Sequence, residues 1–115
     1  MTARASEADA IRKGIELLEE HGWIQGTMHT ADGYCSLGAV RQGALLALGD
    51  DDVEHTVETF RGALEDLRMR ADSLVRDVIK EKYDYSSIVF WNDNIHRTRE
   101  EVLGVFHEAL RRAES

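Results

Sequence analysis

Cys35 is the only cysteine of the chain and the residue type best suited to nucleophilic chemistry. It stands at the expected start of a helix, where the helix dipole can lower the pKa of a thiol. His29, His96 and Asp93 supply the base and the orienting carboxylate of a cysteine-dependent enzyme, provided that the fold brings them to Cys35. The simpler interpretation is a small buried cysteine, because free cysteines are among the most buried residues.

Asn92 and Asp93 form a polar pair directly after an apolar run that ends at Trp91. The run from Ser86 to Trp91 is β-branched and aromatic, which indicates a strand or a buried extended segment. A polar pair in that position is typical of the rim of a cleft, where Asp93 can act as a base or orient a histidine. The alternative is that both residues cap a turn before the next helix.

Trp23 and Gln25 lie between two glycines after the first expected helix. Trp23 either closes the edge of the core or lines a pocket together with Gln25. Metal ligands are present as residue types, but the five histidines and the cysteine match no zinc spacing. There is no phosphate-binding glycine loop and no Gly-x-Ser-x-Gly turn. We therefore expect neither a metal site nor a cofactor.

Helical segments must position these residues. Ser6 is a suitable N-cap for a first helix that ends near Gly22, and a second helix is expected from about Cys35 to Leu48. Two glycines inside the second helix predict close packing against another element. The intervening segment, 22–33, reads as irregular or as a short hairpin. Thr98 and Glu101 form a capping box that begins the last helix.

The strongest pattern is a long helix from about 51 to 83, capped by the acidic residues 50–52. Its apolar residues follow steps of four and three, which is a heptad repeat: Val53, Val57, Phe60, Leu64, Leu67, Ala71, Leu74 and Val78. Val75 and Ile79 widen the stripe, so the C-terminal end is expected to be the more buried. A helix of about 31 residues spans ~46 Å, whereas a compact chain of this size has a diameter of ~35 Å. The helix therefore either breaks near 70–73 or pairs with a second copy, and the unbroken heptad favours a homodimer through the 53–78 face.

Composition limits the class of protein. The 115 residues fit a single domain, 1–115, and 43% are hydrophobic, with no proline. We expect a mainly α fold of about four helices with at most a short hairpin or strand pair. A net charge of −8 disfavours binding to nucleic acid or to an anionic membrane, although an acidic mimic of nucleic acid remains an alternative. No signal peptide or spanning segment is visible, and a cytoplasmic location is expected.

Three short motifs resemble a family of small proteins of unknown function found in actinobacteria and their phages. They are a Gly-Trp-x-Gln-Gly loop at 22–26, a Cys-x-x-Gly-Ala helix start at 35–39 and a Trp-Asn-Asp-x-x-x-Arg-Thr segment at 91–98. The resemblance implies a phage or actinobacterial accessory protein and supplies no reaction. It directs attention to one set of candidate binding residues: Trp23, Gln25, Cys35, Trp91, Asn92 and Asp93. We expect a non-enzymatic factor that binds a host or other partner protein.

Overall fold

The computed structural model describes residues 5–51 and 53–115. Its elements follow the chain in this order: α1 (Glu7–His21), β1 (His29–Thr30), β2 (Gly33–Tyr34), α2 (Ser36–Gly49), α3 (Val57–Tyr83), α4 (Ile88–Asn92) and α5 (Arg99–Glu114). The fold is mainly α, as predicted, and the two short strands form one antiparallel hairpin. None of the described helices is both long and apolar enough to cross a membrane.

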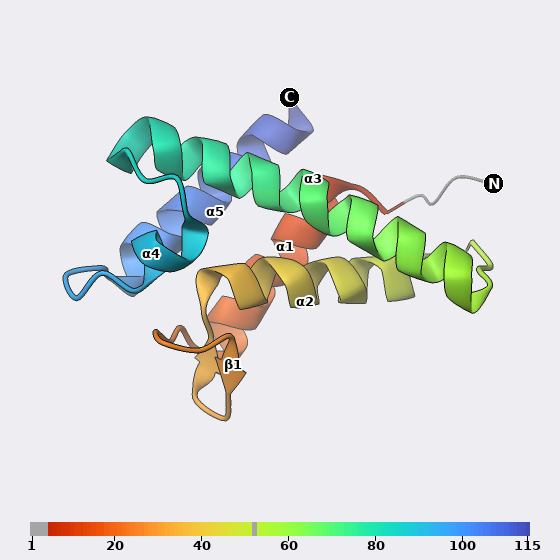
Figure 1. Cartoon of the computed structure of the whole chain (residues 1–115), viewed down its shortest axis with the longest axis horizontal. Helices are drawn as coiled ribbons and strands as arrows, with labels where there is room; N and C mark the ends of the chain where they lie inside the picture. Colours follow the sequence, from red (N-terminus) through yellow and green to blue (C-terminus); the bar gives the residue numbers. More distant parts are fainter. Residues whose placement is uncertain (1–4, 52) are drawn as a thin grey trace.

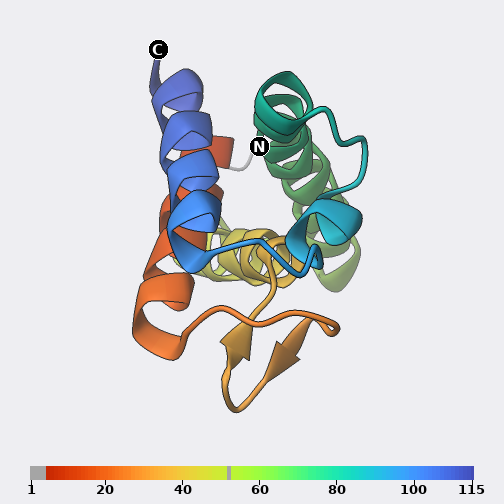
Figure 2. The same ribbon diagram turned by 90° about the vertical axis from the view of Figure 1, so that its left-hand side faces the viewer.

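The helices surround one hydrophobic core. α1 and α5 lie side by side, α3 lies opposite them, and α2 passes between the two groups (Figures 1 and 2). The largest fully buried side chains include Trp91, Phe106, Ile11 and Leu18, which come from three different helices. The hairpin lies at the edge of this core, beside the start of α2 (Figure 2), and its Tyr34 is part of the core. The elements that carry the sequence motifs therefore meet at one end of the molecule.

The predicted N-cap Ser6 and the predicted capping box at Thr98 are both present, and Ser6 forms a capping box as well. Ser6 and Asp9 exchange hydrogen bonds at the start of α1, and Thr98 and Glu101 do so at the start of α5. Close packing of the glycines inside α2 is also confirmed. A Cβ atom on Gly43 would collide with the backbone of α1, which explains why a residue that weakens a helix occurs inside one.

The start of the long helix was predicted wrongly. α3 begins at Val57, and its N-cap is Thr56, whose hydroxyl accepts a hydrogen bond from the Thr59 amide at 3.2 Å. The acidic residues 50–52 were expected to be the cap. Asp50 instead ends α2, and Asp51 accepts hydrogen bonds from the amides of Ala5 and Val53, while residue 52 lies outside the described residues. A carboxylate can cap a loop as well as a helix, so the acidic run alone did not locate the helix start.

The helix α3 is unbroken over its 27 residues, without a break near 70–73. At 1.5 Å per residue it is ~40 Å long, close to the longest dimension of the molecule, 44 Å. Its C-terminal half is the more buried, as predicted: Leu67, Ala71, Val75, Val78 and Ile79 are all buried. No residue from 57 to 66 is fully buried, and this part of α3 extends past the end of α2 (Figure 1).

The segment 86–91 is not a strand. Ser87 is the N-cap of the short helix α4, and its hydroxyl accepts a hydrogen bond from the Phe90 amide at 3.2 Å. A helical turn directs Ile88, Trp91 and Asn92 inward and leaves Val89 and Phe90 exposed. A strand would have directed alternate residues inward, so β-branched composition was outweighed here by the packing of side chains spaced three and four apart.

Candidate functional site

Asn92 is the centre of a buried polar junction. Its side chain is fully buried, and its Oδ1 accepts hydrogen bonds from Trp23 Nε1 at 2.7 Å, from the Ser36 amide at 2.8 Å and from the Ser36 hydroxyl at 2.6 Å. Its Nδ2 donates to the Ile24 carbonyl at 3.1 Å and to Asp93 Oδ1 at 2.9 Å. One side chain thus joins α4, the first turn of α2 and the segment that follows α1.

Gln25 and Asp93 extend this junction toward the surface. The side-chain Nε2 of Gln25 donates hydrogen bonds to the backbone carbonyls of Asn92 and Asn94, at 2.9 and 2.7 Å. In the other direction, Asp93 Oδ1 accepts a hydrogen bond from the Gly26 amide at 3.0 Å. The polar groups of the Gly-Trp-x-Gln-Gly loop are therefore largely used in holding that loop against the end of α4.

Cys35 is the N-cap of α2, and its buried Sγ accepts a hydrogen bond from the Gly38 amide at 3.3 Å. The only other sulfur contact of Cys35 among the described hydrogen bonds is Met28 Sδ, 3.8 Å away. Burial raises the pKa of the Cys35 thiol; hydrogen bonds from α2 amides oppose this, and the charge of Asp93 adds to it. The thiol is therefore favoured over the thiolate that nucleophilic chemistry requires.

Among the described residues, neither His29 nor His96 forms a hydrogen bond with the Cys35 side chain. His29 stacks on Tyr34, with ring centroids 4.0 Å apart, and His96 lies exposed in the turn before α5. Within the described part of the chain, no three His, Cys, Asp or Glu residues are grouped so that they could hold a metal ion. This geometry lends no support to a cysteine–histidine mechanism.

Trp91 belongs to the core rather than to the Asn92 junction. Its indole is fully buried, and its Nε1 has no partner among the described residues. The Arg97 guanidinium lies 4.4 Å from the centroid of the Trp91 ring and 4.7 Å from that of Tyr83, and Arg97 Nε donates to the Trp91 carbonyl at 2.9 Å. Arg97 thereby fixes α4 against the end of α3. Arg97 Nη1 also lies 3.3 Å from Glu101 Oε2, four residues along the chain. Only that pair leaves a charge pattern in the sequence, because the ring faces and the carbonyl carry no charge.

A small pocket opens beside the junction, which we name the α4 pocket. It has a volume of about 240 Å³ and is lined by Gly26, Thr27, Met28, Cys35, Val89 and Asp93. Val89 and Met28 are partly exposed, and the next residue, Phe90, is 74% exposed. Two of the motif residues, Cys35 and Asp93, therefore line a pocket with apolar side chains exposed at and beside it.

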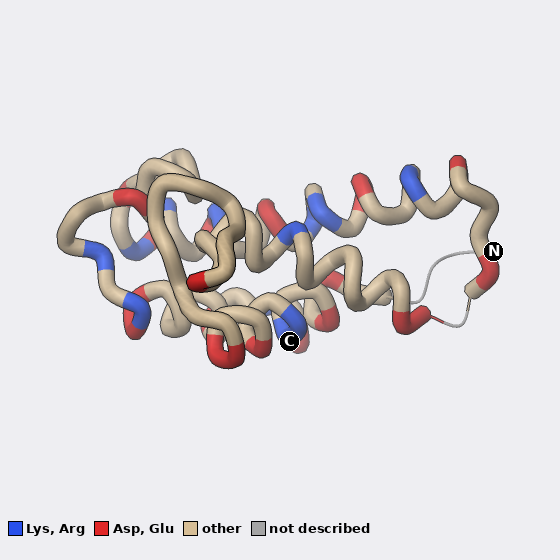
Figure 3. The backbone as a smooth tube through the Cα atoms, turned by 90° about the horizontal axis from the view of Figure 1, so that it is seen from below, with Lys and Arg blue, Asp and Glu red and all other residues tan. Residues whose placement is uncertain are grey.

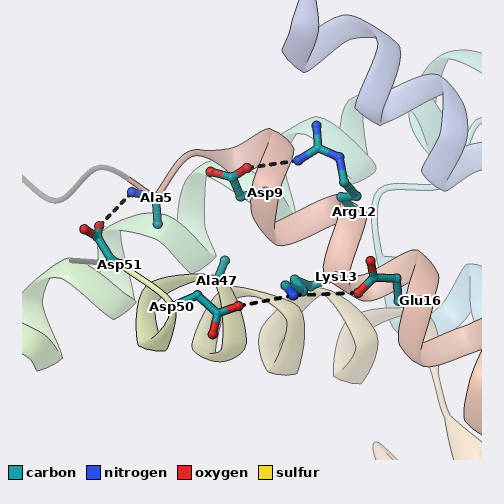
Figure 4. A pocket seen from close by; sticks show the side chains of 8 residues that line it. All are labelled: Ala5, Asp9, Arg12, Lys13, Glu16, Ala47, Asp50 and Asp51. Carbon is teal, nitrogen blue, oxygen red and sulfur yellow. Dashed lines mark hydrogen bonds and ion pairs between the residues drawn. The ribbon is translucent and has the colours of Figure 1, made fainter. Parts of the chain in front are cut away.

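A larger hollow lies elsewhere, between α1 and the end of α2, with a volume of about 430 Å³ (Figure 4). Its charged side chains pair with each other. Lys13 lies 3.2 Å from Asp50 and 3.8 Å from Glu16, and Arg12 lies 2.9 Å from Asp9. The Lys13–Asp50 pair ties α1 to the end of α2, and the other two pairs lie within α1. Together they leave little charge for a ligand, so the α4 pocket is the better candidate site.

The structure brings together most of the residues selected from the sequence. Trp23, Gln25, Asn92 and Asp93 share one hydrogen-bond network, and Cys35 joins Asp93 at the α4 pocket. Sequence reasoning missed Ser36, which makes two of the three hydrogen bonds to Asn92 Oδ1. The only local signal was its position next to Cys35 at a helix start, where hydroxyls commonly serve as caps.

The fold and the site define a small helical protein with a buried asparagine junction next to an apolar surface pocket. The chain belongs to a family of unknown function, DUF6197, which matches residues 2–112. No curated protein and no solved structure matches it.

Proposed function

We propose that the protein is a non-enzymatic interaction factor that binds a partner protein at the α4 pocket. The observation that carries this proposal is the exposed Phe90 next to a pocket of about 240 Å³ with Met28 and Val89 in its lining. Protein interfaces commonly centre on an apolar side chain of one partner that fills a pocket of the other. The volume is below the roughly 300–1,000 Å³ of small-molecule sites, so it suits one side chain of a partner.

Three features support a role in binding rather than in catalysis. The thiol of Cys35 has a raised pKa, and its described hydrogen bonds do not involve a histidine. The side-chain oxygen and nitrogen of Asn92 and the side-chain nitrogen of Gln25 are used by internal hydrogen bonds. Acidic and basic residues are interspersed along α3 (Figure 3), whereas a nucleic-acid mimic requires an acidic face.

The experiment compares proteins captured by the wild type with those captured by surface variants. V89S and F90S remove apolar surface at the α4 pocket, and M69S makes the same kind of change on α3, where Met69 is 61% exposed. All three positions are exposed, so the variants are expected to fold, which circular dichroism checks. We expect a protein that the wild type and M69S retain and that V89S and F90S lose. If each captured protein binds all four forms equally, the α4 pocket is not the binding site.

We further propose the finer assignments that the family resemblance implies. The chain would be an accessory protein of an actinobacterium or of its phage, acting in the cytoplasm on a host protein. The lysate for the capture experiment should therefore come from an actinobacterial host. Capture of the same partner from an unrelated bacterial lysate with equal efficiency would count against a host-specific role.

We also propose a homodimer through the part of the 53–78 face that the molecule's own core leaves uncovered. Leu67, Ala71 and Val78 are buried within the chain. Phe60 and Leu64 are only partly buried, and Val57 is 72% exposed. A second copy that covers this region would bury the exposed start of α3.

A further inference from the structure

A second pocket shares Met28 with the α4 pocket and is lined by residues of the hairpin, α2 and α3. Its volume is about 230 Å³, and its polar lining consists of His29 and Tyr34 from the hairpin, Arg41 and Gln42 from α2 and Arg68 from α3. None of the residues that line it is acidic. The chain as a whole is acidic, with a net charge of −8, whereas this hollow is lined by two arginines and no carboxylate.

One buried donor in this pocket lacks an acceptor. Arg68 Nε is buried and has no hydrogen-bond partner among the described residues. Arg41 approaches one carboxylate, Asp72, but the distance of 3.8 Å from Nη2 to Oδ2 is too long for a hydrogen bond. Buried donors are normally satisfied, and an unpaired one calls for a partner that is absent from the chain itself.

Several other arginines of the molecule form close ion pairs with carboxylates of the same chain. Arg12 and Arg70 are within 2.6 to 3.0 Å of carboxylate oxygens, and Arg111 and Arg112 both bind Glu108. The chain thus supplies acidic residues freely around its arginines elsewhere, but none lines the pocket at Arg68.

We propose that this pocket binds the phosphate group of a small ligand through Arg41 and Arg68. A planar guanidinium presents parallel N–H donors that match the oxygens of a phosphate, and two arginines from different helices can bind the group from two sides. The volume is below the range of about 300–1,000 Å³ for whole small-molecule ligands, which limits the enclosed part to a phosphate-sized group. The stacked rings of His29 and Tyr34 provide a flat surface beside it.

Asp72 sharpens the proposal because it competes for the same arginines. Its side chain is buried, its Oδ1 has no hydrogen-bond partner among the described residues, and it lies four residues after Arg68 on α3. If Arg68 served only to neutralise Asp72, the variant without this carboxylate would bind phosphate no more tightly than the wild type does. If the pocket binds phosphate, removing the carboxylate should strengthen binding, because a negative charge next to the anion is lost.

The test titrates inorganic phosphate and phenyl phosphate into the protein at low ionic strength, followed by two-dimensional NMR. We expect saturable shifts around Arg41 and Arg68, weakened at least about tenfold in R41Q and R68Q and strengthened in D72N. R61Q is the matched control, since Arg61 lies two turns before Arg68 on α3 and outside the pocket lining. Tighter binding of phenyl phosphate than of inorganic phosphate would assign the site to an organic phosphate. Equal binding of the two ligands would assign it to inorganic phosphate itself.

Two results would overturn the proposal. One is the absence of saturable shifts in the wild type with either ligand. The other is an R61Q variant that weakens binding as much as R41Q does, which would indicate non-specific attraction. Because the Arg41 side chain is 47% exposed, R41Q is expected to fold even if R68Q does not, so the comparison of R41Q with R61Q decides the matter in either case.

Discussion

Asn92 holds three segments together, so its removal should cost more stability than its size suggests. N92A would leave Trp23 Nε1, the Ser36 amide and the Ile24 carbonyl without their partner. Each buried unsatisfied group costs about 1–3 kcal/mol, and rearrangement recovers part of that, so we expect a loss of about 3 kcal/mol in the free energy of unfolding. Urea denaturation measures it. N94A, at a half-buried position, should lose less than about 1 kcal/mol; equal losses in the two variants would contradict the junction.

Residue types alone selected Asn92 and Asp93, but not the direction of their side chains. The sequence left open whether the pair caps a turn or lines a cleft. In the structure Asn92 faces inward and Asp93 faces both the Gly26 amide and the α4 pocket. That direction depends on the helical turn of α4, which composition predicted as a strand. The Ser36 contact spans 56 residues of sequence, and such long-range pairs leave no local pattern.

The second prediction at the residue scale concerns pH. Burial raises the pKa of Asp72, while Arg41, Arg76 and Arg68 act in the opposite direction. A pKa that is higher in the folded state than in the unfolded state means that the folded state binds the proton more tightly. The Asp72 contribution to stability is therefore most favourable below the ordinary value of 3.8 and is lost as the pH rises through the folded-state pKa.

D72N carries no charge at any pH, so it should be more stable than the wild type at pH 7. The difference should shrink as the pH falls through the folded-state pKa of Asp72, and it should be nearly gone below 3.8. Urea denaturation at a series of pH values measures this difference. D77N, a substitution at an exposed position on the same helix, is the matched control. A D72N variant that is less stable than the wild type at pH 7 would show that the ion pair with Arg41 outweighs the cost of burying the carboxylate.

At the scale of elements, the sequence was most informative where a helix end is specified by its own side chains. Ser6 and Thr98 form capping boxes with partners three residues away, so the starts of α1 and α5 followed from local chemistry. The start of α3 did not, because Asp51 caps the loop that packs on the N-terminal segment instead. α4 was missed because its β-branched and aromatic composition favours a strand, whereas Ile88, Trp91 and Asn92 are buried on one side of a helical turn.

Glycines inside helices test the packing of elements. A Cβ atom on Gly43 would collide with the Ala10 carbonyl of α1, whereas one on Gly62 of α3 would meet no other atom. G43A should therefore lower the free energy of unfolding by about 1–3 kcal/mol through overpacking, despite the better helix propensity of alanine. G62A should raise it by about 0.5–1 kcal/mol. Thermal and urea denaturation compare the two. A stabilised G43A would show that α1 and α2 can separate at little cost.

At the scale of the whole molecule, the heptad pattern predicted α3 but could not say what covers it. The same stripe serves a helix that packs in its own core and one that pairs with a second copy. In the structure the C-terminal half of the stripe faces α1, α2 and α5, and the N-terminal half extends past α2 (Figure 1). Periodicity records an apolar face, whereas the identity of its neighbour depends on contacts between distant segments.

The last prediction decides what covers the start of α3. We expect light scattering to show a homodimer and V57E to shift it toward the monomer, because a charge buried in an apolar interface is strongly unfavourable. M69E is the matched control, since Met69 is 61% exposed on the same helix but lies outside the heptad set. In hydrogen exchange, the amides of 57–66 should become more protected as protein concentration rises, while those of 67–83 stay constant. A wild type that remains monomeric at its highest soluble concentration, with rapid exchange throughout 57–66, would leave α3 as an unpartnered helix and exclude the dimer.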